Sequence, residues 1–293
     1  MNLVIFGIGY SGLAIARELG ANGVSITGTT RKSDRFSEIR AAGTEPMLYA
    51  GDGFSSELQA RLAEATHVVV SISPESGGDP LLADLGGDLA AKCPMLEWIG
   101  YLSTVGVYGD HSGAWVDETT PCRPVSRRSV FRLEAEEAWA RLCTAAGVPL
   151  ALIRLSGIYG PGRNALANLA AGTARRLVKP GQVFNRIHVA DIAGATALLA
   201  KRRASGVFNV TDDEPSPPQD VVAYAASLMG VAPPPEVDFA TAELSPMARS
   251  FYGESKRVSN AKIKALGYRF RHPDYRTALG ALWRDGTWRG AVS

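Results

Sequence analysis

The chain has 293 residues, of which 46% are hydrophobic and 20% are charged, and its formal net charge at pH 7 is +2. This length allows one large domain or two lobes with an ample core, and the composition is that of a globular protein rather than a disordered one. A net charge so close to zero provides no general field for a polyanion, so we expect no nucleic-acid partner.

Cysteine usage and hydropathy indicate the cellular compartment of the protein. Cys93, Cys122 and Cys143 are odd in number and have no metal-ligand spacing, which favours reduced thiols and no metal site. The first expected strand begins directly after Met1, which we interpret as leaving no room for a cleavable signal peptide. No apolar run is long enough to span a bilayer. We therefore expect a cytoplasmic protein with no membrane partner.

A glycine-rich turn lies near the start of the chain. Residues 2–6 are a short apolar run typical of a buried parallel strand, and leucine and alanine then recur at helical spacing up to Gly23. Gly7, Gly9 and Gly12 fall at this strand-to-helix junction. There the first glycine allows a tight turn, the second lets a pyrophosphate approach the backbone, and the third lets the helix pack on the strand. The pattern predicts a dinucleotide-binding turn.

The second expected strand, residues 24–30, indicates which dinucleotide binds. Its end reaches the adenosine ribose in such folds, where an acid suits a free 2′-hydroxyl and an arginine suits a 2′-phosphate. Thr30, Arg31 and Lys32 occupy this place, and the first acid is Asp34. The pattern favours NADP over NAD, although a polar loop with a few solvated charges would contain the same residues.

Strands and helices alternate through the following residues. Such alternation, with the glycine turn after the first strand, predicts a doubly wound parallel α/β sheet. A loop over residues 74–80 follows the fourth strand, at the sheet edge where ligands bind in these folds. Asp52 could contact the adenine amine or cap the next helix. Strands are expected at residues 46–50, 67–73 and 96–102, and helices at 38–42, 54–64 and 81–92.

Four further segments follow in order: Ser103–Gly109 (STVGVYG), Arg154–Arg163, Arg186–Asp191 (RIHVAD) and Gly206–Val210. With these segments the chain resembles the extended short-chain dehydrogenase/reductase family, which contains NAD-dependent epimerases and dehydratases. The resemblance is greatest to its atypical YeeZ-like branch, which carries Gly-x-Gly-x-x-Gly. It covers nearly the whole chain and implies a Rossmann sheet with a small carboxyl-terminal substrate lobe.

The resemblance also implies how the chain is divided. Residues 1–155 would form the dinucleotide-binding Rossmann domain, and residues 156–293 would complete the sheet and build the substrate lobe. Residues 189–210 would return to the Rossmann domain, so that the lobes interleave. A strand is expected at residues 150–154, and helices at 132–146, 189–201, 216–229, 260–265 and 273–283.

Binding residues are implied by the same resemblance. Substrate contacts would come from Tyr108, Tyr159 and Arg186, with Arg186 holding an anionic group, although aromatic residues at the two tyrosine positions recur in the family as packing elements. His188 is a candidate base, although a histidine there more often bonds the backbone. The cofactor would be bound by the glycine turn, the strand ends and the helix after the fifth strand, through Gly7, Gly9, Tyr10, Ser11, Gly12, Thr30, Arg31, Lys32, Asp52, Ser71, Ile72, Ser73, Arg132, Ser156 and Gly157.

The catalytic residues of the family are only partly matched. Thr104, with Ser103 beside it, matches the residue that hydrogen-bonds the reacting oxygen, although both hydroxyls could instead bond local backbone. Arg128 and Arg132 stand where the family has the acid/base pair Tyr-x-x-x-Lys. Arginine stays charged near neutral pH, so the family's usual proton transfer does not carry over. Arg132 could still bond a ribose, and Arg128 could clamp an anion or stabilise an oxyanion, unless the helix turns it to solvent.

Two functions fit these residues. The first is an NADP-dependent oxidoreductase or epimerase that acts on a small polar substrate, which can be anionic. Thr104 would orient the reacting oxygen of this substrate. The second is a binding protein without dehydrogenase chemistry, which senses the NADP/NADPH ratio for a partner protein. Because Ser103, Thr104 and the substrate-lobe segments are retained, the sequence favours the enzyme. We expect a monomer or a homodimer.

Overall fold

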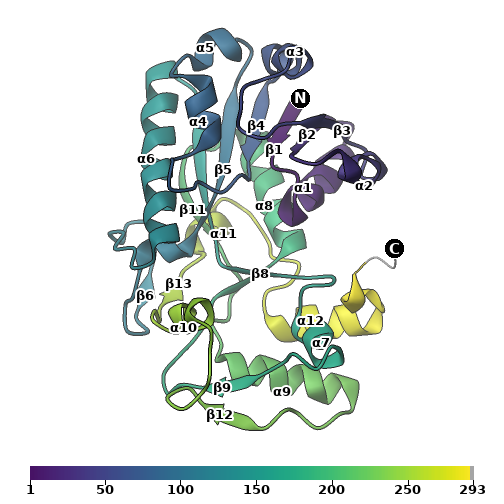
Figure 1. Cartoon of the computed structure of the whole chain (residues 1–293), viewed down its shortest axis with the longest axis vertical. Helices are drawn as coiled ribbons and strands as arrows, with labels where there is room; N and C mark the ends of the chain where they lie inside the picture. The colour runs from purple at the N-terminus through teal and green to yellow at the C-terminus, as the bar shows by residue number, and fades with distance from the viewer. Residues whose placement is uncertain (291–293) are drawn as a thin grey trace. The chain divides into compact units, whose positions relative to one another are not determined.

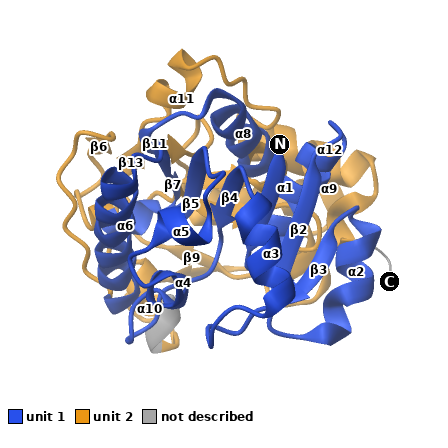
Figure 2. Ribbon diagram, turned by 90° about the horizontal axis from the view of Figure 1, so that it is seen from above, with its two compact units in different colours: residues 1–107, 127–154, 192–208 blue, residues 108–126, 155–191, 209–293 orange. Residues whose placement is uncertain are grey.

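The computed structural model describes residues 1–290, without the side chains of residues 246–248. The chain divides into two compact units (Figure 2). Unit 1 contains residues 1–107, 127–154 and 192–208, and unit 2 contains residues 108–126, 155–191 and 209–293. Each unit is assembled from three separate stretches of sequence, so neither could be obtained by a single cut of the chain.

A seven-stranded sheet forms the centre of unit 1 (Figure 1). Its strands are β1 (Asn2–Phe6), β2 (Ser25–Thr30), β3 (Glu45–Leu48), β4 (His67–Val70), β5 (Trp98–Thr104), β7 (Leu150–Leu155) and β11 (Gly206–Val210). Their order across the sheet is β11-β7-β5-β4-β1-β2-β3, and the pairs β1–β2, β1–β4, β2–β3 and β4–β5 are parallel. The predicted doubly wound parallel α/β fold is confirmed.

Helices cover both faces of this sheet, which is why its middle strands are mostly apolar. On one face, Val4 of β1 and Val68 of β4 share a core with Leu58, Leu81 and Trp139, which come from three different helices. The helices of the sheet are α1 (Tyr10–Gly20), α2 (Phe36–Ala41), α3 (Ser56–Glu64), α4 (Pro80–Leu85), α5 (Leu89–Lys92), α6 (Arg127–Ala146) and α8 (Val189–Arg202).

The opposite face of the sheet is covered by α1 and α8. Successive strand residues point to opposite faces, so Ile5 and His67 lie on the face away from Val4 and Val68. A Cβ built on Gly12 of α1 would lie 3.4 Å from the side chain of Ile5. The imidazole Nε2 of His67 lies 3.3 Å from the carbonyl oxygen of Ala200 in α8. The two helices therefore pack on the same side of β1 and β4.

One local prediction in unit 1 is wrong, and one of the two alternatives for Asp52 is excluded. The helix expected over residues 81–92 is broken between α4 and α5, because Gly86 and Gly87 have φ angles of +60° and +81°, which end a right-handed helix. Asp52 does not cap α3, because the hydroxyl of Ser55 accepts the hydrogen bond from Leu58 N at 3.2 Å.

Unit 2 is built from short parallel strand pairs and a helical cluster. Its strands are β6 (Trp115–Val116), β8 (Gly157–Tyr159), β9 (Arg176–Val178), β10 (Arg186–His188), β12 (Glu236–Asp238) and β13 (Arg257–Val258), paired as β8–β10, β9–β12 and β6–β13. Its helices are α7 (Ala165–Ala170), α9 (Pro218–Met229), α10 (Pro246–Phe251), α11 (Ala261–Ala265) and α12 (Tyr275–Arg284). Leu166, Val221 and Leu279 join α7, α9 and α12 in one core. Within the described residues, no helix is both long enough and apolar enough to cross a membrane.

Candidate functional site

The three glycines of the turn after β1 each meet a different constraint. Gly7 has a φ of +82°, and a Cβ there would lie 3.2 Å from the backbone nitrogen of Ile72. A Cβ on Gly9 would meet no atom within 4 Å, so open space lies in front of this residue. A Cβ on Gly12 would lie 3.1 Å from the carbonyl oxygen of Gly7. These are the tight turn, the close approach and the helix packing that a dinucleotide-binding turn requires.

The open space at Gly9 lies at the first turn of α1. Gly9 is the N-cap of this helix, and no side chain caps the helix there. The turn is held against β2, because Ile8 N donates to the oxygen of Thr29 at 2.8 Å and Gly7 N donates to the hydroxyl of Thr29 at 3.0 Å. Backbone N–H groups at the start of a helix carry partial positive charge and attract anions. The turn therefore fits the pyrophosphate of a dinucleotide.

Basic residues gather where β2 ends. The buried hydroxyl of Thr30 accepts a hydrogen bond from Lys32 N at 3.3 Å, and the side chains of Arg31 and Lys32 are exposed. Arg35, in the 3-10 turn η1 (Ser33–Arg35), donates from Nη1 to the carbonyl oxygen of Ile8 at 3.0 Å. A guanidinium is thus attached to the glycine turn itself. Arg35 was not among the predicted site residues, because only the fold shows this contact.

The segment after β4 passes beside the glycine turn. Ser71 N donates to Phe6 O at 2.8 Å, which extends the β1–β4 pairing beyond Val70. Ile72 follows as the closest neighbour of Gly7, and the side chain of Ser73 is exposed. Asp52, after β3, is also exposed. Tyr10 and Ser11 lie in the first turn of α1, where Ser11 is buried.

The guanidinium of Arg132, in α6, makes most of its hydrogen bonds to other residues of the fold. Its Nη1 donates to the carbonyl oxygen of Leu102 at 2.9 Å and to the phenol oxygen of Tyr101 at 3.0 Å. The same nitrogen lies 3.3 Å from Ile72 O, and Nη2 donates to the hydroxyl of Ser73 at 3.1 Å. Burial raises the pKa of Tyr101, and the charge of Arg132 opposes that shift. Arg132 thus fastens the carboxyl ends of β4 and β5 together, and its contact with a ribose stays a prediction.

Ser103 belongs to a buried ionic group. Its hydroxyl donates a short hydrogen bond to Glu136 Oε1, and Arg154 donates to both oxygens of Glu136, with Nη2 at 2.7 Å from Oε2. All three residues are buried, with exposed fractions of 5% or less. Both oxygens of the Glu136 carboxylate therefore accept hydrogen bonds within the fold. The Ser103 hydroxyl positions Glu136 rather than facing solvent. Glu136 and Arg154 were not predicted, because their pairing crosses from a helix to a strand.

Thr104 is the more accessible hydroxyl at the end of β5. It is partly exposed, and its Oγ1 accepts a hydrogen bond from Gly106 N at 3.1 Å. Ser129 of α6 comes close to the same loop, since a Cβ on Gly106 would lie 2.7 Å from the Ser129 hydroxyl. Arg128, beside Ser129 in the sequence, is exposed. The structure thus places two hydroxyls, from Thr104 and Ser129, around Gly106; the catalytic roles of Thr104 and Arg128 stay predictions.

Tyr108 and the residues after β7 lie in unit 2. The phenol of Tyr108 is fully buried and donates to Asn209 Oδ1 at 2.8 Å, so it is used within the fold. The hydroxyl of Ser156 is buried without a hydrogen-bond partner. Gly157 is exposed, and its N–H donates to Asn185 O at 3.1 Å. Contacts of these residues with substrate or cofactor stay predictions.

Arg186 is a partly exposed cation inside unit 2. Its Nη1 donates to the carbonyl oxygens of Phe184 and Ser216, at 3.0 and 3.2 Å. Among the described residues, Nε and Nη2 of Arg186 find no hydrogen-bond partner. Burial lowers the pKa of this guanidinium, and the nearby carboxyl of Asp212 opposes that shift. The arrangement suits an anionic group that would accept hydrogen bonds from the unused edge of the guanidinium.

Asp212 and Tyr159 are buried neighbours of this cation. Oδ2 of Asp212 and the phenol oxygen of Tyr159 are both buried without hydrogen-bond partners. Burial raises the pKa of Asp212 to about 8, although the charge of Arg186 opposes this shift. Burial likewise raises the pKa of Tyr159. Asp212 was not predicted, because its main-chain bond to Arg186 O joins two distant stretches of sequence.

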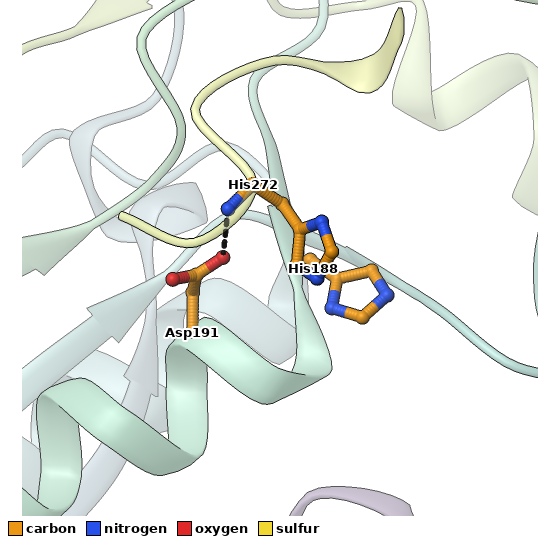
Figure 3. Close-up of side chains that lie close together, drawn as sticks. All are labelled: His188, Asp191 and His272. Atoms are coloured by element: carbon orange, nitrogen blue, oxygen red, sulfur yellow. Dashed lines mark hydrogen bonds between the residues drawn. The ribbon is translucent and has the colours of Figure 1, made fainter. Parts of the chain in front are cut away.

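His188, Asp191 and His272 bring three possible metal ligands together in unit 2, within 4.8 Å of one another (Figure 3). The Asp191 oxygens and His188 Nδ1 are hydrogen-bonded within the fold, whereas His188 Nε2 and His272 Nδ1 are buried without a hydrogen-bond partner. Asp191 accepts from Tyr268 OH, Arg271 N and His272 N, and His188 Nδ1 accepts from Ala190 N at 3.2 Å. The two imidazole rings are in contact, with centroids 3.9 Å apart and planes tilted by 48°. Burial and His272 lower the pKa of His188 to about 3. The group fits a neutral packing cluster better than a metal site.

Comparisons with known proteins agree with this fold. The sequence profile of the NAD dependent epimerase/dehydratase family matches residues 88–211. Protein YeeZ of Escherichia coli K12 is 29% identical over 93% of this chain and 96% of its own length. A solved structure of a conserved protein of unknown function from Silicibacter pomeroyi DSS is 50% identical, with a TM-score of 0.89, and covers 97% of this chain and 98% of that chain.

More distant structures share the fold alone. Human epimerase family protein SDR39U1, solved with NADPH, is 20% identical with a TM-score of 0.75 and covers 97% of this chain and 100% of its own. The UDP-glucose 4-epimerase of Thermus thermophilus, solved with NAD, is 22% identical with a TM-score of 0.73, and each chain is covered completely. Taken with the glycine turn and the seven-stranded sheet, the family profile and the match to YeeZ show that the chain belongs to the NAD-dependent epimerase/dehydratase family of extended short-chain dehydrogenases/reductases.

Proposed function

We propose that this protein is an NADP-dependent oxidoreductase or epimerase that acts on a small anionic substrate. The observation that carries the proposal is the open space at Gly9, in front of the uncapped first turn of α1. A valine or leucine at this position would leave no approach for a pyrophosphate. Arg31 and Arg35 supply the positive charge that favours a 2′-phosphate.

The chain's own residues would have distinct tasks. A bound nicotinamide would supply or accept a hydride. Thr104 would orient the reacting oxygen, because it is the partly exposed hydroxyl at the carboxyl end of β5. Arg186 would hold the anionic group through Nε and Nη2. Tyr159 and Arg186 remain the proposed substrate residues of unit 2, and the solvent-exposed Arg128 is a further candidate to contact an anion.

Binding and hydride transfer can be tested separately. Calorimetric titration with NADP⁺ and with NAD⁺ should show tighter binding of NADP⁺. The protein, incubated with NADPH deuterated at C4 and a panel of small keto acids, aldehydes and phosphorylated sugars, should then transfer deuterium to one class of product. Absence of dinucleotide binding would overturn the proposal.

A second function is favoured by a different observation. Arg132 is bonded to oxygens of the fold, and Ser103 is bonded to Glu136, so two residues expected at the reaction centre are already occupied. A sensor of the NADP/NADPH ratio would need the cofactor turn but not the reaction centre. It would bind the oxidised and reduced cofactors with different affinities and would transfer no deuterium to any substrate in the panel.

Location and assembly belong to the same proposal. Cys93 and Cys143 are buried free thiols, which supports a reducing compartment such as the cytoplasm. We propose a monomer or homodimer that has a small-molecule substrate and no nucleic-acid or membrane partner. Light scattering with and without NADP⁺ would give the oligomeric state.

A further inference from the structure

The guanidinium of Arg186 is held in unit 2 by one of its three nitrogens. Nη1 donates to the carbonyl oxygens of Phe184 and Ser216, at 3.0 and 3.2 Å, which orients the group. The main-chain oxygen of Arg186 accepts from Asp212 N at 2.7 Å, so the backbone is fixed as well. Nε and Nη2 form the forked edge of the guanidinium. Within the part of the chain that the structure describes, this edge has neither a hydrogen-bond partner nor an ion-pair partner.

The register of β8 and β10 places Tyr159 on the same face as Arg186. These strands are parallel, with Arg186 opposite Gly157 and His188 opposite Tyr159. Because alternate residues of a strand share a face, the side chains of Arg186, His188 and Tyr159 leave this strand pair on one side. The rings of Tyr159 and His188 are in contact there, with centroids 5.4 Å apart. Gly157 has no side chain to cover the guanidinium.

Two oxygens beside Arg186 are buried without hydrogen-bond partners. They are Oδ2 of Asp212 and the phenol oxygen of Tyr159, in residues that are 1% and 8% exposed. Oδ1 of Asp212 accepts from Glu214 N at 3.3 Å, so a proton on this carboxyl would lie on Oδ2. Burial raises the pKa of Asp212 to about 8, which favours the protonated form. Because unpaired buried polar groups are costly, a ligand that accepts from both O–H groups would be favoured.

The charges around Asp212 suit an anion with a single negative charge. Besides Arg186, the carboxylates of Asp213 and Asp274 act on Asp212. Asp213 is paired with Lys264, whose Nζ lies 3.1 Å from Oδ1. The charges that remain are one positive and one negative, so a second negative charge on the ligand would be repelled. A carboxylate carries one charge, whereas a phosphate monoester carries about 1.5 to 2 at pH 7.

Resting on the proposed function, we propose that the substrate is a carboxylic acid whose carboxylate accepts hydrogen bonds from Nε and Nη2 of Arg186, from the carboxyl O–H of Asp212 and from the phenol of Tyr159. The planar fork of the guanidinium meets the two carboxylate oxygens, and the two O–H groups use their remaining lone pairs. Asp212 is then a hydrogen-bond donor to the substrate and not a counter-ion of Arg186.

NMR of arginine side chains on the full chain tests the choice of anion. The Nε–H signal of Arg186 is identified by its absence in Arg186→Lys. At pH 7 this signal should move to saturation with lactate and with glucuronate. Glucose, which lacks the carboxylate, should not move it, and glucose 6-phosphate should bind at least about 5-fold more weakly than glucuronate. A signal that neither carboxylate moves, or that the phosphate moves at equal concentration, overturns the inference.

Nearly isosteric variants test the two O–H groups, with glucuronate affinity measured by calorimetric titration. Tyr159→Phe removes one donor to a charged group and should weaken binding roughly 10- to 100-fold. Asp212→Asn keeps a donor and should stay within about 3-fold of the wild type. The control is Tyr224→Phe, whose phenol bonds Arg276 O at 3.4 Å; it should change affinity less than about 2-fold.

Two results with these variants would overturn the inference. Unchanged affinity in Tyr159→Phe would remove the phenol from the site. Binding at least about 10-fold tighter in Asp212→Asn would show that Asp212 is an ionised competitor of the ligand. Because these titrations need no dinucleotide, they are independent of the proposed function. Loss of NADP⁺ binding with intact glucuronate binding would overturn the proposed function, and the reverse would overturn only the inference.

Discussion

Arg132 donates a hydrogen bond of 2.9 Å from its guanidinium to the main-chain oxygen of Leu102, which fastens helix α6 to the carboxyl end of β5. The family to which the chain belongs has a lysine at this position, and the resemblance implied a contact with the cofactor ribose. Here the longer, forked side chain also bonds Tyr101 and Ser73. The substitution therefore adds a structural link between the ends of β4 and β5.

The first prediction concerns this link. Arg132→Met should lower the free energy of unfolding by about 1.5–3 kcal/mol, because it leaves the Leu102 oxygen without its charged donor. Urea denaturation followed by circular dichroism would measure the change. Arg127→Met is the control on the same helix, since Arg127 is exposed and contacts the ring of Phe131. If the two variants were equally stable, the bonds of Arg132 would contribute nothing to the fold.

The second prediction separates two glycines of the turn. Gly9→Val should preserve the fold, because its Cβ meets open space, yet it should weaken NADP⁺ roughly 100-fold or more by blocking the pyrophosphate. Gly12→Val should cost about 1–3 kcal/mol of stability, because its Cβ meets Gly7 O at 3.1 Å. Calorimetry and thermal melting would distinguish the two effects. Normal NADP⁺ affinity in Gly9→Val would contradict the assignment of the turn.

The glycine turn shows what the sequence could predict. Its spacing, the apolar strand before it and the helical period after it are all local, so the fold class, β1, α1 and the dinucleotide site followed from short stretches. The break between α4 and α5 was missed because an apolar helical period runs through Gly86 and Gly87, and their φ angles depend on the fold.

Other parts of the site depend on contacts between distant residues. Glu136 meets Ser103 across 33 residues of sequence, and His272 N meets Asp191 across 81. Nothing in the local pattern of α6 marks Glu136 as buried, since Glu134 and Glu137 on the same helix are exposed. Arg35 was likewise one of several cations after β2 until the fold placed it against Ile8.

The third prediction tests the buried ionic group in unit 1. Glu136→Ala should destabilise the protein by about 3–5 kcal/mol, because it leaves Arg154 charged and unpaired in the interior. Glu137→Ala is the control, since Glu137 is exposed and lies 4.0 Å from Arg141; it should cost less than about 1 kcal/mol. Chemical denaturation would measure both. Replacing both partners, as Glu136→Leu with Arg154→Met, should cost less than Glu136→Ala alone, and a larger cost would show that the pair contributes more than charge compensation.

The fourth prediction concerns acid stability. The pKa of His188 is lowered to about 3 by burial and by His272, whereas an unfolded histidine titrates near pH 6.5. The unfolded state therefore binds more protons between these values, and the stabilisation present above about pH 6.5 is lost as pH falls toward 3. His188→Asn keeps an acceptor for Ala190 N but cannot titrate, so its stability should fall less steeply over this range. Parallel curves for the variant and the wild type, measured by urea denaturation from pH 7 to 4, would contradict the assignment.

The last prediction concerns Asp212, whose pKa is raised to about 8 by burial against the attraction of Arg186. Because an unfolded aspartate titrates near 3.9, the folded state keeps a proton that the unfolded state releases. The stabilisation from this neutral acid is complete below about pH 3.9 and is lost as pH rises toward 8, at a limit of about 1.4 kcal/mol per pH unit. Asp212→Asn retains the acceptor for Glu214 N and has no proton to lose. The variant should therefore gain stability relative to the wild type between pH 4 and 8, by on the order of a few kcal/mol in urea denaturation.

Asp213→Asn is the control, because it loses only exposed bonds to Asn260 and Lys264 and should change stability by less than about 1 kcal/mol. A constant difference between Asp212→Asn and the wild type across this range would mean that Asp212 is ionised in the fold, and Arg186 would then have an internal counter-ion instead of an open place for a substrate anion.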